Sequence, residues 1–242
     1  GAGPFAQNLT MWVGLLGAAI AAREGKLLSL ATGEFLPKGP SGDAAHVLSA
    51  IVGSFVATLF AFGGVALVQS DKLAGDVIAI GVPVWVSDLV LPFAFSLIAL
   101  RLAWRASDKW LGRGIAALGI VAGLYFSQHL EFFEGHALTP WLVVVLLAGV
   151  LGAPIFTLLG GVALFAFLVQ GSKPIVLMIK AYEELTTSTG LAAIPLFTLA
   201  GFLLAEGKAS ERLLRLFRAW VGWMPGGTSI AAATLCAFFT LF

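Results

Sequence analysis

The residues best suited to chemistry lie in one short stretch, His129-Leu-Glu-Phe-Phe-Glu-Gly-His136. Two imidazoles and two carboxylates are a suitable ligand set for zinc or iron. Their spacing fits no helix face well, because the carboxylates of Glu131 and Glu134 point away from the two histidines. A polar surface turn is the simpler interpretation, and a metal-dependent membrane hydrolase is the less favoured alternative. The chain has no nucleophile elbow, zinc-protease motif, P-loop or dinucleotide fingerprint. We therefore predict no enzyme activity, catalytic residue, metal or resident cofactor.

One carboxylate interrupts an otherwise apolar stretch. Asp88 lies between Val77 and Leu100 in a segment with no other charge. A carboxylate inside a membrane span is costly, so it is a functional-site hypothesis by default. Because Trp85 lies nearby, Asp88 could instead sit at the edge of the span and make a helix-end or inter-helix contact. Both alternatives stay open, and Asp88 is the possible functional charge.

Glycine and proline interrupt two other apolar stretches where a plain membrane anchor would not need them. Proline inside a helix frees a backbone carbonyl one turn earlier, and glycine permits a break or a close approach. Broken helices at membrane depth form binding sites in many transporters. A kink that serves packing alone is the alternative. The predicted structural helix breaks are Pro154, Gly160, Gly161, Pro195, Gly201, Gly226 and Gly227.

The composition defines the solvent in which these residues act. Charged residues make up 11% of the 242 residues, and hydrophobic residues make up 59% before glycine is counted. A soluble domain has about 25% charged residues. The net charge of +1 and the single cysteine, Cys236, exclude a basic nucleic-acid binder and a disulfide-stapled secreted domain. The chain is too apolar for a cytosolic enzyme, so it must lie in lipid.

Seven apolar stretches define the predicted elements. A chain in hydrocarbon must satisfy its backbone polar groups internally, and continuous apolar runs favour helices over a closed barrel. We predict an all-α integral membrane protein with about seven apolar helical segments and at least one interfacial amphipathic helix. The third segment extends back to Val77 if Asp88 is accommodated. The charge-free stretches are 1–22, 44–70, 89–100, 114–130, 135–172, 185–205 and 219–242.

Lysine and arginine indicate the orientation, because their excess marks the cytoplasmic side. If each stretch crosses once, nine of the 14 basic residues fall on one side and five on the other. The side with nine is predicted to be cytoplasmic. The basic connector 208–218 then falls on the opposite side, which contradicts the rule. Either stretch 185–205 is not a simple crossing, or these arginines lie at the outer surface.

That basic connector has the pattern of an amphipathic helix. Apolar residues recur at helical spacing from Leu213 to Trp220, and basic residues occupy the positions between them. Such a helix lies in the membrane interface. A basic extension of a neighbouring span is the alternative. The residues assigned to the interfacial helix are Arg212, Arg215, Arg218 and Trp220.

Four segments resemble one transporter family. Residues 194–227, which begin Ile-Pro-Leu-Phe and end Met-Pro-Gly-Gly, closely resemble the first part of the large membrane subunit of tripartite ATP-independent periplasmic (TRAP) transporters. Leu151-Gly-Ala-Pro154 resembles the first helix of that subunit. Upstream, the segments 12–26 and 80–85 resemble the small membrane subunit, although Leu27 stands where many small subunits have histidine. Finding both in one chain implies a fused protein.

The resemblance implies three parts: small-subunit-like scaffold helices at 1–110, a joining helix and connector at 111–140, and the N-terminal part of a large-subunit-like transport domain at 141–242. It also implies a multi-pass protein of the bacterial or archaeal cytoplasmic (inner) membrane. Such a protein imports small organic anions, carboxylates in particular, by sodium symport and an elevator mechanism. A periplasmic binding protein delivers the solute.

The residues that bind sodium are not identified in this sequence. By the resemblance, sodium binds in a hairpin that begins at or beyond Phe242, and the residues that bind the solute stay unknown. We expect the chain to be a piece of a longer protein, cut at both ends. A membrane scaffold subunit without transport activity of its own is the alternative function.

Overall fold

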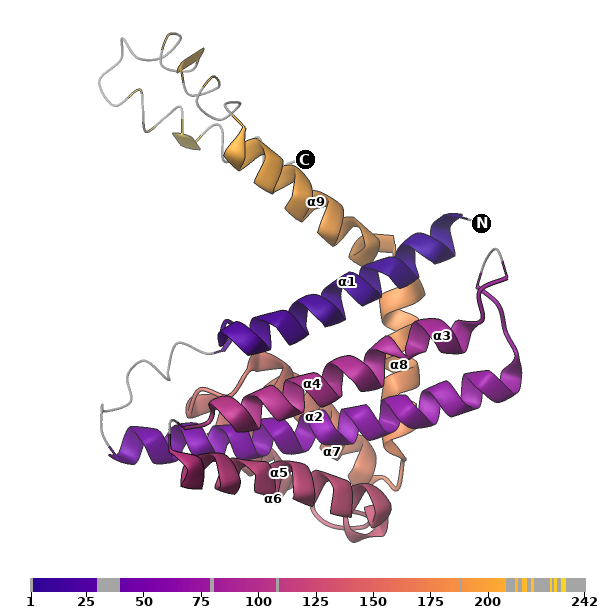
Figure 1. Cartoon of the computed structure of the whole chain (residues 1–242), viewed down its shortest axis with the longest axis vertical. Coiled ribbons are helices and arrows are strands. Elements are labelled where there is room, and N and C mark those ends of the chain that lie inside the picture. Colours follow the sequence, from indigo (N-terminus) through magenta and orange to yellow (C-terminus); the bar gives the residue numbers. More distant parts are fainter. Residues whose placement is uncertain are drawn as a thin grey trace. The chain divides into compact units, whose positions relative to one another are not determined.

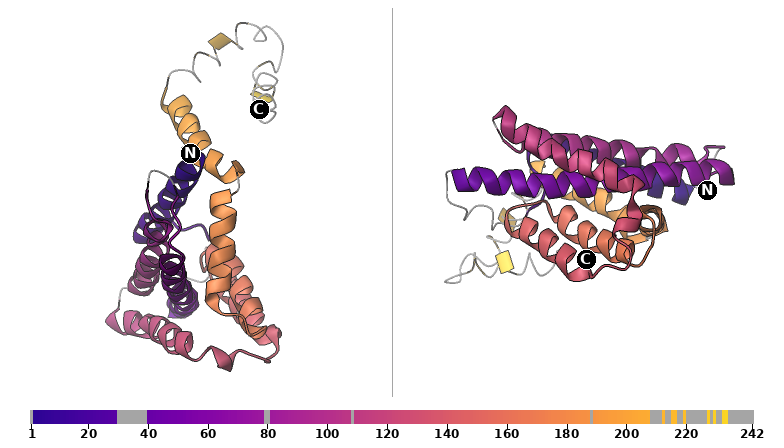
Figure 2. Two further views of the ribbon diagram at one scale, coloured as in Figure 1. Left: turned by 90° about the vertical axis from the view of Figure 1, so that its right-hand side faces the viewer. Right: turned by 90° about the horizontal axis from the view of Figure 1, so that it is seen from below.

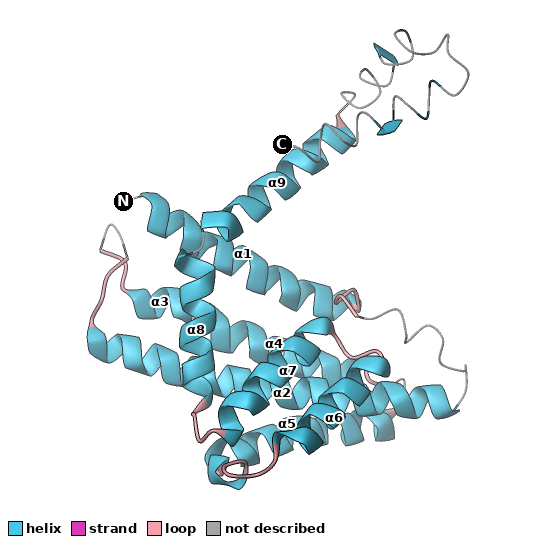
Figure 3. Ribbon diagram, turned by 180° about the vertical axis from the view of Figure 1, so that it is seen from behind, coloured by secondary structure: helices cyan, strands magenta, loops and turns pink. Residues whose placement is uncertain are grey.

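The regular elements of this protein are helices, as predicted from its composition. The computed structural model describes residues 2–29, 40–78, 81–107, 109–187 and 189–207, together with a few isolated residues beyond 207. The chain forms two units, 1–189 and 190–242. The elements are α1 Ala2–Glu24, α2 Pro40–Ala74, α3 Val84–Asp88, α4 Val90–Arg105, α5 Trp110–Gln128, the 3-10 turn η2 Leu130–Phe132, α6 Leu138–Val150, α7 Ile155–Val169, α8 Pro174–Thr187 and α9 Thr189–Glu206 (Figures 1 and 3).

Helix α2 is the centre of the first unit. It has 35 residues and packs against α4, α5 and α8, while α1 packs against α4 (Figures 1 and 2). Helices α1, α2, α4 and α5 run side by side, and α8 crosses α1 and α2 steeply. The main core joins α2 to α6 and α7 through buried side chains that include Val56, Leu59, Val145 and Leu164. A single long helix thus connects most of the unit.

The outward faces of these helices are apolar, which is the pattern expected in lipid. On α5 the residues turned toward the bundle are small, with Ala116, Gly119 and Gly123 buried. Leu118 and Val121 on the opposite side are 57% and 59% exposed. Three helices within the described residues are long and apolar enough to cross a membrane: Gly42–Ala74, Val84–Arg105 and Trp110–Gln128. Because lipid offers no hydrophobic drive between helices, small residues at the contact and large residues outside are the expected arrangement.

The stretch 135–172 does not cross once, as our orientation count assumed. It folds into a hairpin of α6 and α7 with its tip at Gly152-Ala-Pro154. The tip meets the chain after α1, because the Ile155 amide donates to the Leu28 carbonyl at 2.8 Å. The other ends meet where the Gly135 amide donates to the Val169 carbonyl at 3.3 Å. Proline cannot continue α6, and Gly152 with φ of +92° turns the chain back.

Because of the hairpin, the basic residues are distributed between the two ends of the bundle differently from our prediction. A Cβ atom at Gly171 would lie 2.9 Å from Glu134 Oε1, so the chain entering α8 returns to the end at which α5 finished. Lys173 therefore lies at the same end as Lys72, and not with the larger basic group as the single crossing implied. That basic group gathers at the opposite end, where α1 and α4 finish and α5 begins. It contains Arg23, Lys26, Arg101, Arg105, Lys109 and Arg113.

Candidate functional site

Two arginines on α4 close the C-terminus of α1. The Arg101 guanidinium donates to the Ala19 carbonyl, and Arg105 Nη1 donates to the Arg23 carbonyl at 2.7 Å. The last four carbonyls of a helix, here including that of Arg23, have no partner within the helix and carry partial negative charge, so a cationic donor stabilises them. The Ala19 carbonyl lies one turn earlier, inside α1, and takes Arg101 as an additional donor. The spacing of four residues places both arginines on one face of α4. These two residues therefore fix the end of α1 against α4.

Gly25 makes this arrangement possible. It follows α1 with φ of +72°, and the Lys26 amide donates back to the Ala21 carbonyl at 2.9 Å, which closes the helix in a glycine-dependent turn. A Cβ atom at Gly25 would lie 2.7 Å from Arg105 Nη2. Glycine thus allows the positive φ, and its lack of a side chain leaves room for the guanidinium in its present position.

The tip of the α6–α7 hairpin completes the basic end of the bundle. Ser29 and Pro154 form an isolated antiparallel bridge next to the Ile155–Leu28 hydrogen bond. Gly53 on α2 lies close to both α4 and α7. A Cβ atom at Gly53 would lie 3.1 Å from Leu102 Cδ1 and 3.3 Å from Thr157 Oγ1. The first turn of α7 is therefore held directly against α2 and the chain that follows α1.

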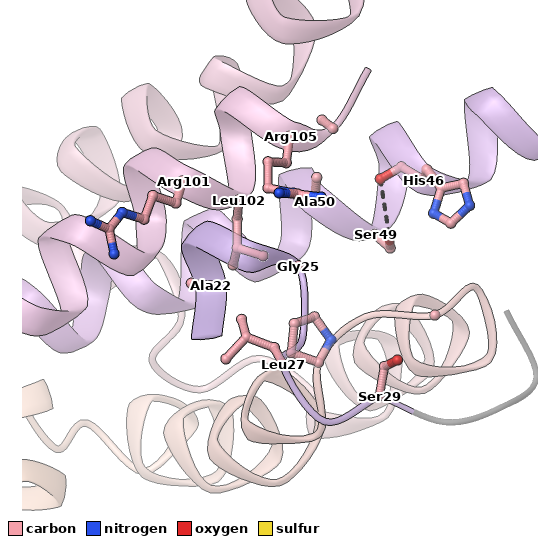
Figure 4. Close-up of a pocket in the computed structure, with 13 residues that line it drawn as sticks. Ala22, Gly25, Leu27, Ser29, His46, Ser49, Ala50, Arg101, Leu102 and Arg105 are labelled. Carbon is pink, nitrogen blue, oxygen red and sulfur yellow. Dashed lines mark hydrogen bonds between the residues drawn. The ribbon is translucent and has the colours of Figure 1, made fainter. Parts of the chain in front are cut away.

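These elements line an open cavity of about 220 Å³ (Figure 4). Its wall includes Arg101 and Arg105 from α4 and His46 and Ser49 from α2. The Ser49 hydroxyl donates to the His46 carbonyl at 2.9 Å. Gly25, Ser29, Gly152 and Pro154 supply the remaining wall toward α1 and the hairpin. The cavity thus combines basic side chains with hydroxyl groups, and it is the candidate functional site.

A second polar group lies at the opposite end, around Asn8. Asn8 Oδ1 accepts hydrogen bonds from the Ser87 hydroxyl at 2.8 Å and from the Tyr182 hydroxyl at 3.3 Å. The Trp12 indole nitrogen donates to the Ser87 carbonyl at 3.0 Å. These contacts connect α1, α3 and α8 through buried polar atoms, which are worth more in a low-dielectric interior than in water.

Asp88 lies beside this group at the end of α3. Its side chain is fully buried, and neither carboxylate oxygen has a hydrogen-bond partner among the described residues. The Asp71 carboxylate on α2 interacts with it electrostatically. Asp88 is therefore inside the bundle rather than at an exposed span edge, and its assignment as a functional charge stays a prediction.

The two predicted histidines do not converge on a common point. His129 stacks on Tyr125 with ring centroids 4.5 Å apart, and His136 stacks on Phe132 at 5.6 Å. Both imidazoles are exposed. No group of three or more potential metal-ligating side chains occurs within the part of the chain that the structure describes. The stretch forms η2 and a turn, as the simpler interpretation expected.

Only one predicted helix break in the described hairpin is a break. Pro154 lies between α6 and α7, whereas Gly160 and Gly161 lie inside α7, which continues through them. Their lack of a side chain serves packing, since a Cβ at Gly160 would lie 2.8 Å from the Phe60 ring. The prediction of breaks at these two glycines is wrong because α7 uses them for close approach to α2.

The predicted breaks in the second unit are also corrected where they are described. Helix α9 continues through Pro195 and Gly201. Membrane helices tolerate such residues, because neighbouring groups can satisfy the freed backbone carbonyls. Gly226 lies outside the described residues, and Gly227 is described as helical in isolation. No break is assigned at either position.

The interfacial helix remains largely a prediction. Arg212 and Arg215 are helical and exposed, while Arg218 and Trp220 lie outside the described residues.

On the exposed face of α8, Lys180 donates a hydrogen bond to Glu183 Oε2 at 2.9 Å. That hydrogen bond raises the pKa of Lys180 above its usual range, because Glu183 stabilises the charged ammonium.

Sequence reasoning missed the contact that places α5. A Cβ at Gly119 would lie 2.3 Å from Ser54 Oγ and 2.4 Å from the Ile51 carbonyl oxygen, and one at Gly123 would lie 2.7 Å from Thr58 Cβ. Gly119 and Gly123 form a small-xxx-small pair, which is a known helix-contact signal. That signal was present in the sequence, whereas no sequence signal indicated that Arg101 and Arg105 bond to α1 carbonyls.

Comparison with known proteins identifies both parts of the chain. Residues 2–112 match the family model for the DctQ component of tripartite ATP-independent periplasmic transporters. Residues 140–242 match the model for the DctM component of the same transporters. Helix α5 begins at the end of the first matched range and continues between the two ranges, and the predicted division of the chain into three parts stays a prediction.

A curated relative has the same two components in its name. The chain is 31% identical over 170 residues to the isethionate TRAP transporter permease protein DctMQ of Oleidesulfovibrio alaskensis (strain ATCC BAA-1058 / DSM 17464 / G20). The match covers 66% of this chain and 26% of that relative. The chain thus spans about a quarter of the length of the curated relative it matches. No solved structure matches the chain. The chain belongs to the TRAP transporter family, as a membrane protein in which a DctQ-like part precedes a DctM-like part.

Proposed function

We propose that this chain is part of a secondary transporter that imports small organic anions by sodium symport, with a periplasmic binding protein delivering the solute. The observation that carries the proposal is the order of the two matches, DctQ at 2–112 and DctM at 140–242, on one chain. The family name itself describes a periplasmic system of three components that does not use ATP. A gradient of an ion must then supply the driving force.

The proposed solute is a small organic carboxylate or sulfonate. The carboxylate follows from the resemblance, and the sulfonate follows from the name of the isethionate permease. Both groups spread one negative charge over neighbouring oxygens, so similar donors can bind them. By the resemblance, the sodium ions and the solute bind in the part of the transporter that follows Phe242.

The proposed membrane is the bacterial or archaeal inner membrane, with the basic end of the bundle in the cytoplasm. This orientation follows from the positive-inside rule and the six basic residues gathered around Arg101 and Arg105. Counting α6 and α7 as two crossings also moves the connector 208–218 to the cytoplasmic side, which removes the contradiction in the single-crossing count. The binding protein would then contact the periplasmic connectors 71–76 and 131–140.

A scaffold without transport activity of its own is the second candidate. The close packing of α5 against α2 at Gly119 and Gly123 favours it, because such a contact resists sliding. In the proposed transporter these helices are the fixed scaffold beside a moving elevator domain. The two candidates differ in whether the whole gene product moves solute.

Uptake into proteoliposomes tests the proposal. The whole gene product is reconstituted with its binding protein, and labelled isethionate and a labelled dicarboxylate are offered under an inward sodium gradient. We expect uptake of at least one anion, and loss of that uptake when potassium replaces sodium or the binding protein is omitted. Absence of sodium-dependent uptake of either class would overturn the transport proposal. Residues 1–242 reconstituted alone serve as the control that isolates the scaffold.

A further inference from the structure

The basic cavity has more hydrogen-bond donors than the protein uses. Arg101 and Arg105 each place one nitrogen on an α1 carbonyl. A guanidinium carries five N–H groups and no acceptor, so each retains donors beyond that contact. Neither arginine forms an ion pair in the part of the chain that the structure describes, where the ion pairs are Lys26–Glu24 and Lys180–Glu183. The hydrogen bonds to α1 therefore use only part of the donors of Arg101 and Arg105.

The lining of the cavity contains positive charge without a matching carboxylate. His46 joins the two arginines in the wall, and no aspartate or glutamate is among the lining residues. Like charges that share a small site repel one another, so an anion in that site stabilises the two guanidinium groups, and the His46 imidazole can add an N–H donor. Ser29 adds a hydroxyl group that can donate to an oxygen atom of an anion, whereas the Ser49 hydroxyl already donates to the His46 carbonyl. The chemistry of the wall suits an oxyanion with several acceptor atoms.

Small residues leave the space that such an anion needs. Gly25 and Gly152 contribute backbone alone, and Ala22, Ala50 and Ala106 contribute a methyl group each. Figure 4 shows Arg105 and His46 on neighbouring helices above the chain from Gly25 to Ser29. A site formed by four separate segments is also a junction, because it includes both the DctQ-like helices and the DctM-like hairpin tip.

The position of the cavity in the bundle favours a membrane lipid as the source of the anion. Arg23, Lys26, Lys109 and Arg113 surround this end of the helices. Basic pockets between membrane helices on the cytoplasmic side bind the phosphates of anionic headgroups. The outward faces of α4 and α5 carry exposed apolar residues such as Leu100 and Leu118, against which acyl chains can pack.

We propose that the cavity between Arg101, Arg105 and His46 binds a phosphate group, supplied by an anionic phospholipid or by free phosphate. Bound there, the phosphate accepts hydrogen bonds from both guanidinium groups and from the Ser29 hydroxyl. It neutralises the basic end of the bundle and connects α2 and α4 to the tip of the α6–α7 hairpin. This inference does not rest on the proposed transport activity.

Binding of short-chain lipids to the purified protein tests the inference. Dihexanoyl phosphatidylglycerol, dihexanoyl phosphatidylcholine and inorganic phosphate are titrated separately in a neutral detergent, with native mass spectrometry as the readout. We expect phosphatidylglycerol to bind more tightly than phosphatidylcholine. Phosphate that binds and competes with the lipid supports the same site for a free anion. Phosphate that does not bind identifies the lipid as the source.

Three variants show whether the binding is at this cavity. Arg105→Gln removes a guanidinium and His46→Gln removes an imidazole, both at exposed positions, and each is expected to weaken binding about tenfold. Lys109→Gln removes the same charge at the same end but lies outside the cavity, so binding should be retained. If Arg105→Gln fails to fold, His46→Gln decides the question. Equal binding by all variants, or no binding of any probe, would overturn the inference.

Discussion

Two helix contacts in the first unit, residues 1–189, hold by different means. Helices α2 and α5 approach through Gly119, Gly123 and Ser54, with almost no charge between them. Helices α1 and α4 are fixed by two guanidinium groups on backbone carbonyls. The first contact depends on shape and the second on satisfied polar groups. Helices attract one another only weakly in lipid. Close packing at glycines holds α5 against α2, and hydrogen bonds from guanidinium groups to carbonyls hold α1 against α4.

The largest expected effect comes from adding one methyl group to the first contact. Gly119→Ala places a Cβ 2.3 Å from Ser54 Oγ and 2.4 Å from the Ile51 carbonyl oxygen, so the helices must separate. We expect the free energy of unfolding to fall by about 3 kcal/mol. Gly114→Ala on the same helix has no atom within 4 Å and is the matched control, expected to stabilise by about 0.5 kcal/mol. Thermal midpoints in detergent measure both, and equal midpoints would refute the close approach.

The second contact is tested by removing a guanidinium. Arg101→Ala leaves the Ala19 carbonyl without its charged donor, and we expect a loss of about 2 kcal/mol. Arg101→Lys retains the charge but has no fork, so it should recover part of the loss. The same thermal measurement applies, with salt titration as a second readout. A loss that disappears at high salt would show that long-range charge, rather than the hydrogen bond, holds α1.

These contacts show what a sequence can and cannot predict. Apolar stretches are local, so the helical class and the small residues of α5 could be predicted from composition and spacing. The length of stretch 135–172, nearly twice a single crossing, contained the signal for the hairpin that our orientation count missed. The partners of Arg101 and Arg105 could not be predicted, because a backbone carbonyl exists at every residue and only the fold selects which helix end meets them.

Gly25→Ala tests the contact between α1 and α4 by separating backbone strain from the effect on Arg105. Its φ of +72° disfavours alanine by about 1 kcal/mol, and the added Cβ meets Arg105 Nη2 at 2.7 Å. Gly75 has a φ of +74° and no atom within 4 Å, so Gly75→Ala has the backbone strain alone. We expect Gly25→Ala to lower the thermal midpoint more than Gly75→Ala does. Combining Gly25→Ala with Arg105→Gln should remove the difference, and its persistence would exclude the guanidinium as the cause.

The smallest expected effect concerns Asp88, which ends α3 just before α4 begins. Asp88 is buried without a hydrogen-bond donor and near Asp71, whereas the arginines at the far end of α4 have carbonyl partners. Replacing the carboxylate by a neutral amide of the same shape removes the cost of burying a charge, and the amide can donate to the Asp71 carboxylate. We expect Asp88→Asn to raise the free energy of unfolding by about 1 kcal/mol. Asp76→Asn, at an exposed position, is the control and should change little.

Transport measured on the same two variants separates structure from function at Asp88. A residue retained against its own stability is expected at a functional position, since activity and stability are often opposed there. If Asp88→Asn is more stable and transports less, the carboxylate is retained for a role in the working cycle. If it is less stable than the unchanged protein, Asp88 has a partner that the described residues do not include, and the contrast between the two ends of α4 no longer holds.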